Sequence, residues 1–248
     1  KASGRTSLTA PEGKQVCDAY GIPVPKEGVA TTAAAAAKLA SGMGYPVVLK
    51  IVSPDILHKT EAGGVLVGVK SAADVKPGFA KILANAKKYD RKAQILGVQV
   101  QQMVGGGQEV IIGAVTDPSF GKLVAFGLGG VLVEVMKDIT FRLAPATKDD
   151  ALSMLDGIAA AAVLKGVRGS EPVNRTALAT AIRNVSQLVA DFPEIAEMDL
   201  NPVFASKAGA IAADVRIVLD FHPAPARYRP KHEDIVREHF MNKCVPPQ

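Results

Sequence analysis

The residue types best suited to chemistry lie within one short stretch of the chain, from Lys50 to Val65. Lys50 ends the apolar run VVLK, and Gly63 and Gly64 open the next valine-rich run, GGVLVGV. Glycines let backbone N–H groups approach phosphate oxygens closely, and a lysine ammonium supplies a compact positive charge. The spacing indicates a phosphate-binding edge, although the G-x-x-x-x-G-K-[ST] motif is absent. A lysine at a strand end can also simply be solvated.

A histidine lies between these two features, in the polar segment SPDILHKTEA. The chain has four histidines, and this one, His58, is flanked by Asp55, Lys59 and Glu61. One interpretation is a surface imidazole without a chemical role. The other is a general base or a nucleophile toward phosphorus, because imidazole is largely neutral near pH 7 and can form a covalent intermediate. The residues alone leave both interpretations open.

Oxygen-bearing side chains near residue 200 could hold a divalent cation. Asp199 and Asn201 are two positions apart on one predicted strand and so project from the same face, and Asp214 lies on the next predicted strand. Mg²⁺ prefers such hard oxygen ligands. Arg216 shares the face of Asp214 and could clamp a phosphate. The Asn201-Pro202 pair could equally be a turn or the end of a strand.

A base-binding segment is expected just before the glycine run at 105–107. Backbone groups from Gln101 and Gln102 to Val104 could pair with an adenine edge, and Glu109 could bind ribose hydroxyls. These two assignments depend on position alone, because neither residue type is specific to a nucleotide.

The elements that must position these residues are short and divide into two α+β lobes. Strands are expected at 45–52, 63–69, 93–104, 109–115, 122–128, 139–145, 197–205 and 209–219. Helices are expected at 12–20, 32–41, 71–89, 147–158 and 174–191, most of them with a capping Ser, Thr or Asn. The segment TDPSFG predicts an antiparallel hairpin between the fourth and fifth strands.

These elements give a domain plan with boundaries in the polar and glycine-rich segments. A flexible lead-in is expected at 1–11, a first lobe at 12–104, a second lobe at 105–221, and a polar tail at 222–248. In the tail, HEDIVREHF predicts a short amphipathic helix, whose apolar side chains could make it a docking arm.

Composition excludes several classes of protein. The net charge of +5 comes from scattered residues, and aromatic residues make up only 5% of the chain with no Trp, so we expect no nucleic-acid partner. No apolar run approaches the roughly 20 residues of a membrane helix, so we expect no membrane partner. Cys17 and Cys244 lack partners at metal-ligand spacing. Free thiols in a reducing, cytoplasmic compartment are therefore expected.

Four long motifs resemble the ATP-grasp part of NDP-forming acyl-CoA synthetases. The motifs are GYPVVLKIVSPDILHKTEAGGVLVGV, GQEVIIGAVTDPSFGKLVAFGLGGVLVEV, EMDLNPV and AADVRIVL. The resemblance is strongest to the β subunit or β domain of ADP-forming acetyl-CoA synthetases and more distant to the β subunit of succinyl-CoA synthetases.

The resemblance implies an α/β ATP-grasp fold, with two lobes that clamp a nucleotide. It assigns phosphate binding to Lys50 and to the loop that begins at Gly63, and Mg²⁺ binding to Asn201 and Asp214. It also assigns to His58 the role of a phosphorylated histidine, with ATP and ADP as substrates. The implied reaction is acyl-CoA + ADP + Pi ⇌ carboxylate + CoA + ATP.

The chain has no room for CoA-binding and ligase domains once 12–221 is assigned. The resemblance therefore implies a CoA-binding α subunit, in an α2β2-type assembly, or a fused domain. Two alternatives stay open. One is an ATP-grasp ligase that works without phosphohistidine. The other is a non-catalytic ATP-grasp regulatory domain of a protein acetyltransferase.

Overall fold

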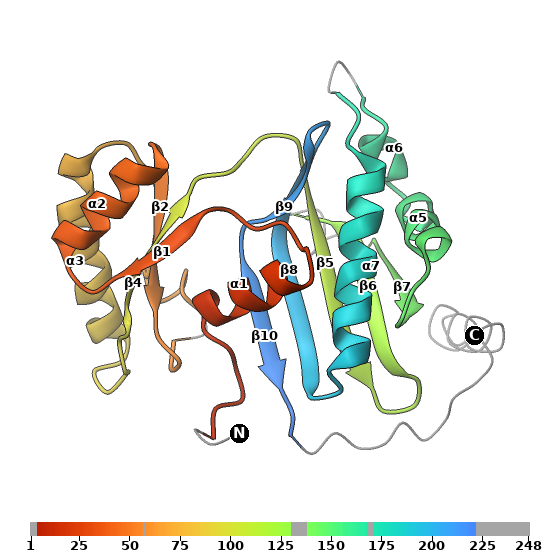
Figure 1. Ribbon diagram of the computed structural model, residues 1–248, viewed down its shortest axis with the longest axis horizontal. Helices are drawn as coiled ribbons and strands as arrows, with labels where there is room; N and C mark the ends of the chain where they lie inside the picture. Colours follow the sequence, from red (N-terminus) through yellow and green to blue (C-terminus); the bar gives the residue numbers. More distant parts are fainter. Residues whose placement is uncertain (1–3, 57, 130–137, 168–170, 222–248) are drawn as a thin grey trace, which may run out of the picture.

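The computed structural model describes residues 4–56, 58–129, 138–167 and 171–221. Within them the chain forms two antiparallel sheets that lie side by side, each covered by helices (Figure 1). Residues 103–107 connect one sheet to the other. The expectation of two mixed α/β lobes is therefore confirmed.

The first lobe is built on a four-stranded sheet with the order β1-β4-β2-β3. Its strands are β1 (Glu27–Ala30), β2 (Val47–Val52), β3 (Val65–Val69) and β4 (Gly97–Gln102). Helices α2 (Ala33–Met43) and α3 (Ala72–Tyr89) cover one face of this sheet (Figure 1). All six residues of β2 are buried, because the strand has a neighbour on each side and helices above it. Lys50 is the one charged residue among these six.

Both covering helices begin at the predicted caps. The Thr32 hydroxyl accepts a hydrogen bond from the Ala35 N–H at 3.2 Å, and the Ser71 hydroxyl accepts one from the Asp74 N–H at 3.3 Å. Such caps satisfy backbone donors that the first turn of a helix leaves free. Helix α2 runs through the stop expected after residue 41 and ends before Gly44, which has a φ of +87°.

The second lobe is built on a sheet with the order β10-β8-β5-β6-β7, to which β9 adds by pairing with β8. Its strands are β5 (Gln108–Asp117), β6 (Gly121–Leu128), β7 (Ile139–Leu143), β8 (Ile195–Ser206), β9 (Gly209–Ala212) and β10 (Val215–Leu219). Its helices are α5 (Lys148–Gly157), α6 (Ala161–Leu164) and α7 (Arg175–Asp191). The predicted hairpin is confirmed, because β5 and β6 pair antiparallel from Val110–Leu128 to Asp117–Gly121.

The expected final strand at 209–219 is interrupted in the structure. Strand β9 pairs with the end of β8 and β10 with its beginning, which leaves Ala213 and Asp214 at the break. Pro202 lies opposite this break and has no N–H to donate to a ladder, although its carbonyl accepts from the Ala213 N–H at 2.9 Å. Asp214 therefore lies between two strands, and the prediction that it lies within one was wrong.

Helix α1 (Ala10–Ala19) packs on the second lobe, and not on the first lobe to which the sequence assigned it. Cys17 and Ile22 belong to the core of the second lobe. The Tyr20 hydroxyl donates to Asp191 of α7 at 2.7 Å. Before the helix, Leu8 donates from its N–H to the Ile217 carbonyl at 3.0 Å, so the described part of the expected flexible lead-in pairs with β10.

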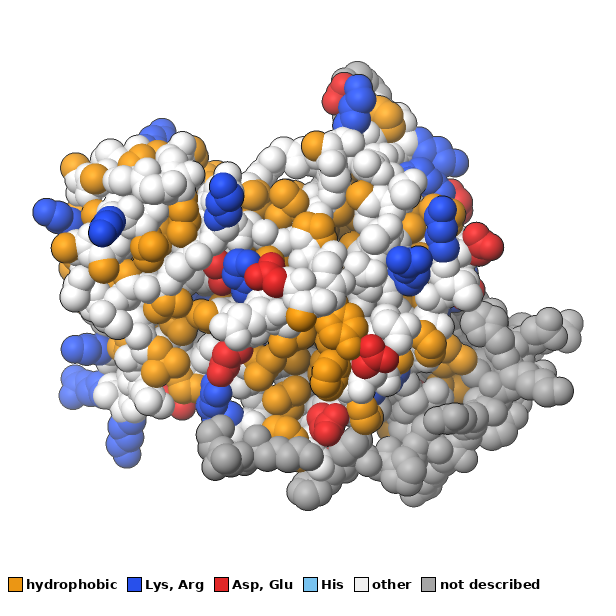
Figure 2. All heavy atoms as spheres, in the orientation of Figure 1, with side chains coloured by type: hydrophobic (Ala, Val, Ile, Leu, Met, Phe, Trp, Pro, Cys, Tyr) orange, Lys and Arg blue, Asp and Glu red, His pale blue; other side chains and the backbone are white. Residues whose placement is uncertain are grey.

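Hydrophobic side chains gather on the surface between α1 and the lower half of α7 (Figure 2). They line an apolar groove of about 270 Å³ that includes Val16, Phe192 and Leu219. The groove also includes Phe221, the last described residue before 222–248. The expected tail lies outside the described residues, and its docking role stays a prediction. No helix in the described part of the chain is long and apolar enough to cross a membrane.

Candidate functional site

A cavity of about 790 Å³ lies between the two lobes. The first lobe contributes residues from β2, β3, the end of β4 and the loop between β2 and β3. The second lobe contributes residues from β8, from the break after β9 and from the start of β10. Of the predicted site residues, nine line this cavity: Lys50, His58, Val65, Gln101, Val104, Asp199, Asn201, Asp214 and Arg216.

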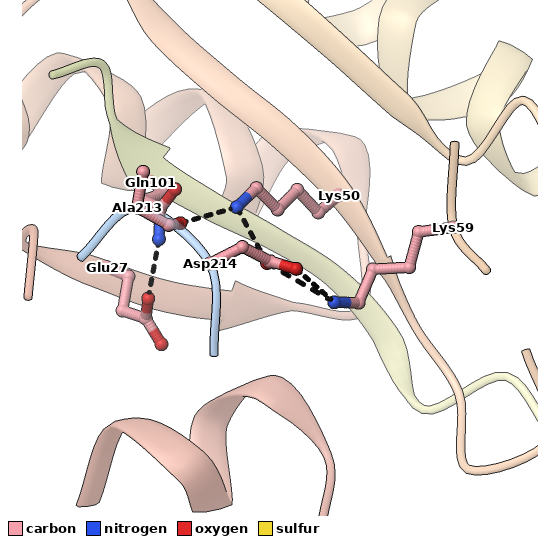
Figure 3. A network of polar contacts seen from close by, with 6 residues as sticks. All are labelled: Glu27, Lys50, Lys59, Gln101, Ala213 and Asp214. Atoms are coloured by element: carbon pink, nitrogen blue, oxygen red, sulfur yellow. Dashed lines mark hydrogen bonds and ion pairs between the residues drawn. The ribbon is translucent and has the colours of Figure 1, made fainter. Parts of the chain in front are cut away.

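Lys50 extends from β2 across the cavity to the second lobe (Figure 3). Its Nζ lies 2.8 Å from the Ala213 carbonyl oxygen and 3.0 Å from Asp214 Oδ1. Only 9% of the side chain is exposed. A buried ammonium requires such partners, because an unpaired buried charge is costly. The break between β9 and β10 provides both of them, a carbonyl and a carboxylate outside the β8 ladder.

Lys59 also binds the Asp214 carboxylate (Figure 3). The sequence analysis did not predict this contact. Its Nζ lies 3.3 Å from both Asp214 oxygens, and 17% of the side chain is exposed. In the sequence, Lys59 is visible only as a cation directly after His58. Its partner Asp214 is 155 residues away, so the sequence does not indicate the ion pair. Asp214 thus has two lysine partners, both from the first lobe.

His58 begins a hydrogen-bonded turn at residues 58–64, which we call the histidine turn. The Ala62 N–H donates to the His58 carbonyl at 3.1 Å, and the Gly64 N–H donates to the Lys59 carbonyl at 2.8 Å. The imidazole is 61% exposed and lines the cavity, and its Nδ1 lies 3.9 Å from Glu61 Oε1. The exposed imidazole is therefore accessible to a molecule bound in the cavity.

The two glycines of the histidine turn shape the loop without lining the cavity. Gly63 has a φ of +61°, a region that other residues rarely adopt, and its carbonyl accepts from Asn85 Nδ2 at 2.9 Å. A Cβ on Gly64 would lie 2.5 Å from Ile51 Cγ2. Both glycines are therefore needed for the turn, whereas Val65, the next residue, does line the cavity.

The segment at the end of β4 only partly matches the expected base-binding site. Gln101 is buried, and its Nε2 donates to Glu27 Oε2 at 3.0 Å. Burial raises the pKa of Glu27, and hydrogen bonds from Gln101 and Gln99 partly offset that rise. Gln102 does not line the cavity, and its N–H already donates to the Lys26 carbonyl at 2.8 Å.

Glu109, the expected ribose ligand, is not brought to the cavity either. It lies on β5 with an exposed side chain. Gly129 packs against its backbone, since a Cβ on Gly129 would lie 2.9 Å from the Glu109 carbonyl carbon. The prediction depended on the closeness of residue 109 to the glycine run, and closeness along the chain does not fix which face a strand residue occupies.

Oxygen donors from the second lobe converge on the cavity. Asp199 and Asn201 on β8 line it together with Asp214. Burial raises the pKa of Asp199; Glu197 and Asp214 raise it further, and Arg216, which is hydrogen-bonded to Glu197, lowers it. Within the described residues, no cluster of three His, Cys, Asp or Glu side chains could hold a metal.

The donor set nevertheless fits Mg²⁺. Asn201 and Asp214 offer amide and carboxylate oxygens on one cavity, and Asp214 already attracts two cations. Mg²⁺ is usually held by one or two protein oxygens, with phosphate and water completing the shell. Two protein donors that line one cavity are consistent with that pattern.

A comparison with protein-family models decides the family. The model described as an ATP-grasp domain matches residues 1–219. The chain belongs to the ATP-grasp family. This finding confirms the α/β ATP-grasp fold that the four sequence motifs implied.

Proteins similar in sequence include ADP-forming CoA ligases. The chain is 47% identical to the acetate–CoA ligase [ADP-forming] I subunit beta of Pyrococcus furiosus, over 88% of this chain and 94% of that protein. It is also 47% identical to the 4-hydroxybutyrate–CoA ligase [ADP-forming] of Nitrosopumilus maritimus. That match covers 88% of this chain but only 32% of the ligase, so the chain spans about a third of that protein.

A solved structure with a similar fold is the dinucleotide forming acetyl-coenzyme A synthetase 1 of Ca. Korarchaeum cryptofilum. With coenzyme A, Ca-AMPCP and HgCl⁺ bound, it has a TM-score of 0.86 and 42% identity, over 88% of this chain and 96% of that chain. A second structure of that protein holds coenzyme A and Mg-AMPPCP, with a phosphohistidine segment that points towards the nucleotide binding site. Its TM-score is 0.78 at 40% identity, over 88% of this chain and 95% of that chain.

Proposed function

We propose that this chain is the nucleotide-binding β component of an ADP-forming acyl-CoA synthetase, and that His58 relays a phosphoryl group to ADP. The observation that carries the proposal is the position of His58. It is exposed at the mouth of a cavity that also holds Lys50, Arg216 and Asp214. The Korarchaeum structure, whose phosphohistidine segment points towards its nucleotide binding site, supports a phosphohistidine in this type of enzyme.

The proposed step is a transfer between nitrogen and oxygen. The P–N bond of phosphohistidine breaks as a terminal oxygen of ADP forms a P–O bond, and the imidazole keeps the bonding electrons. Because Nδ1 of His58 faces Glu61, we assign the transfer to Nε2. In phosphoryl transfer the protein itself makes and breaks few covalent bonds. Its contribution is mainly to position the reacting groups and to stabilise their charge.

The residues around the cavity supply the charge stabilisation. Lys50 and Arg216 would hold phosphate oxygens from opposite lobes, and Asn201 and Asp214 would hold Mg²⁺. A bound Mg²⁺ would neutralise charge on the nucleotide phosphates. Gln101 and Val104 line the end of the cavity nearest the connection between the lobes and would face the base.

The chain is proposed to act with a CoA-binding partner. It spans nearly the whole Pyrococcus β subunit but about a third of the Nitrosopumilus ligase. A separate α subunit, in an α2β2-type assembly, or a fused domain would therefore form the acyl phosphate. A reducing, cytoplasmic location is part of this proposal and is supported by the free, buried thiol of Cys17.

Labelling by ATP tests the relay. With Mg²⁺ and [γ-³²P]ATP, the full chain should acquire acid-labile, base-stable phosphate, the stability expected of a P–N bond. His58→Ala should remove at least nine-tenths of the label, because that substitution removes the nucleophile.

A matched control comes from the other three histidines of the chain. The triple variant His222→Asn, His232→Asn and His239→Asn should keep wild-type labelling. Labelling that persists in His58→Ala would overturn the relay. Full turnover of that variant with its partner would favour a ligase without phosphohistidine, and failure of the wild type to bind Mg·ADP in calorimetry would favour a regulatory domain.

A further inference from the structure

Lys59 connects the histidine turn to the second lobe. The other end of the turn is fixed to the first lobe, because the Ile51 N–H donates to the Gly64 carbonyl at 2.7 Å and Asn85 Nδ2 donates to the Gly63 carbonyl at 2.9 Å. At the His58 end, Lys59 reaches across the cavity to Asp214. The turn is therefore bonded along the chain to the first lobe at both ends, is hydrogen-bonded to it at Gly63 and Gly64, and is linked to the second lobe by the Lys59 ion pair.

We propose that Lys59 is a positioning residue that couples occupation of the cation site to the position of the histidine turn. In the free chain, its ion pair with Asp214 holds the turn against the second lobe. A divalent cation bound to Asp214 displaces the Lys59 ammonium and releases the His58 end of the turn. This inference rests on the proposed function, because it takes Asp214 as a cation ligand.

The charges at Asp214 make a bound cation compete with the lysine ammonium groups. One carboxylate now faces two ammonium groups, and a divalent ion would add two more positive charges at the same oxygens. Two unit charges 4 Å apart repel by about 1 kcal/mol in water and by about 4 kcal/mol near a protein surface, and a divalent ion doubles that repulsion. This repulsion favours the departure of at least one lysine when the cation binds.

The remaining contacts identify Lys59 as the lysine that leaves. Lys50 keeps a second acceptor, the Ala213 carbonyl at 2.8 Å, and is rooted in the buried strand β2. Among the described residues, Lys59 donates to Asp214 alone, and its side chain is more exposed than that of Lys50, 17% against 9%. Loss of the Asp214 contact thus removes this link between the histidine turn and the second lobe, while the Ala213 carbonyl keeps Lys50 in the cavity.

Hydrogen exchange of the full chain, followed by mass spectrometry with MnCl₂ as the probe, tests the coupling. In the wild type, Mn²⁺ should speed amide exchange in the histidine turn by about two- to fivefold, the effect expected when a partly buried ion pair of modest strength is lost. In Lys59→Met, which keeps the length of the side chain without its charge, exchange should already be fast and Mn²⁺ should change it little.

Two further variants separate this role from a general structural one. Lys59→Arg should restore slow exchange in the free chain and the response to Mn²⁺. Lys70→Met, at an exposed lysine just after β3, should behave as the wild type.

Three results would overturn the coupling. They are wild-type exchange in free Lys59→Met, an undiminished Mn²⁺ response in that variant, and no Mn²⁺ response in the wild type. Phosphate labelling of His58 is measured separately. Absence of labelling with the expected exchange pattern would overturn the relay and support the coupling.

Discussion

At the residue scale, the central feature of the site is one carboxylate shared by two lysines. Residue types and spacing indicated Lys50, His58, Asp214 and Arg216 as candidates, and all four line the cavity, but the roles of Lys50, His58 and Asp214 came from the family resemblance. Lys59 and Glu27 could not be predicted, because their partners are distant in sequence: Lys59 pairs with Asp214, and Glu27 pairs with a glutamine 74 positions away. Such contacts depend on how the lobes meet.

The role of Lys50 can be measured by its neutral variant. Lys50→Met should weaken Mg·ADP binding about ten- to hundredfold, because a hydrogen bond to a charged group contributes about 1.5–3 kcal/mol. Isothermal titration calorimetry gives the Kd directly, with Lys70→Met as the matched control at an exposed position. A Lys50→Met chain that is folded by circular dichroism and binds Mg·ADP with the wild-type Kd would remove Lys50 from the phosphate site.

At the element scale, local signals predicted local structure. Helix-capping residues and runs of β-branched residues correctly predicted most helices and strands, and the turn residues between β5 and β6 predicted their hairpin. They could not show against which lobe α1 packs, because an apolar helix face is compatible with any apolar surface. The short β1 has a glycine among its four residues and therefore lacked a strand pattern. The break at Asp214 could not be predicted either, because it lies opposite Pro202 of the neighbouring strand β8.

The connection between β4 and β5 contains a matched pair of glycines for a stability test. A Cβ on Gly107 would lie 2.1 Å from the Ala205 carbonyl oxygen, and its φ is +79°. A Cβ on Gly105 would meet nothing within 4 Å. Gly107→Ala should therefore lower the free energy of unfolding by about 2 kcal/mol or more, and Gly105→Ala by less than about 1 kcal/mol. Urea denaturation measures both, and equal losses would show that Gly107 is not constrained.

At the scale of the whole molecule, the site exists only where the two lobes meet. The chain starts on the second lobe with α1, builds the first lobe, and returns through the β4–β5 connection (Figure 1). Lys50 and His58 come from one lobe, and Asn201, Asp214 and Arg216 from the other. A change in the angle between the lobes would alter the charges around a nucleotide and the position of His58 together.

The most direct test of the relay is a chase with ADP. The full chain is labelled with [γ-³²P]ATP, freed of nucleotide by rapid gel filtration, and mixed with Mg²⁺ and unlabelled ADP. If His58 carries the phosphoryl group to the nucleotide, the label should leave the protein and appear in ATP, one molecule for each phosphohistidine consumed. Label that stays on the protein, or that appears as inorganic phosphate without ATP, would contradict the account.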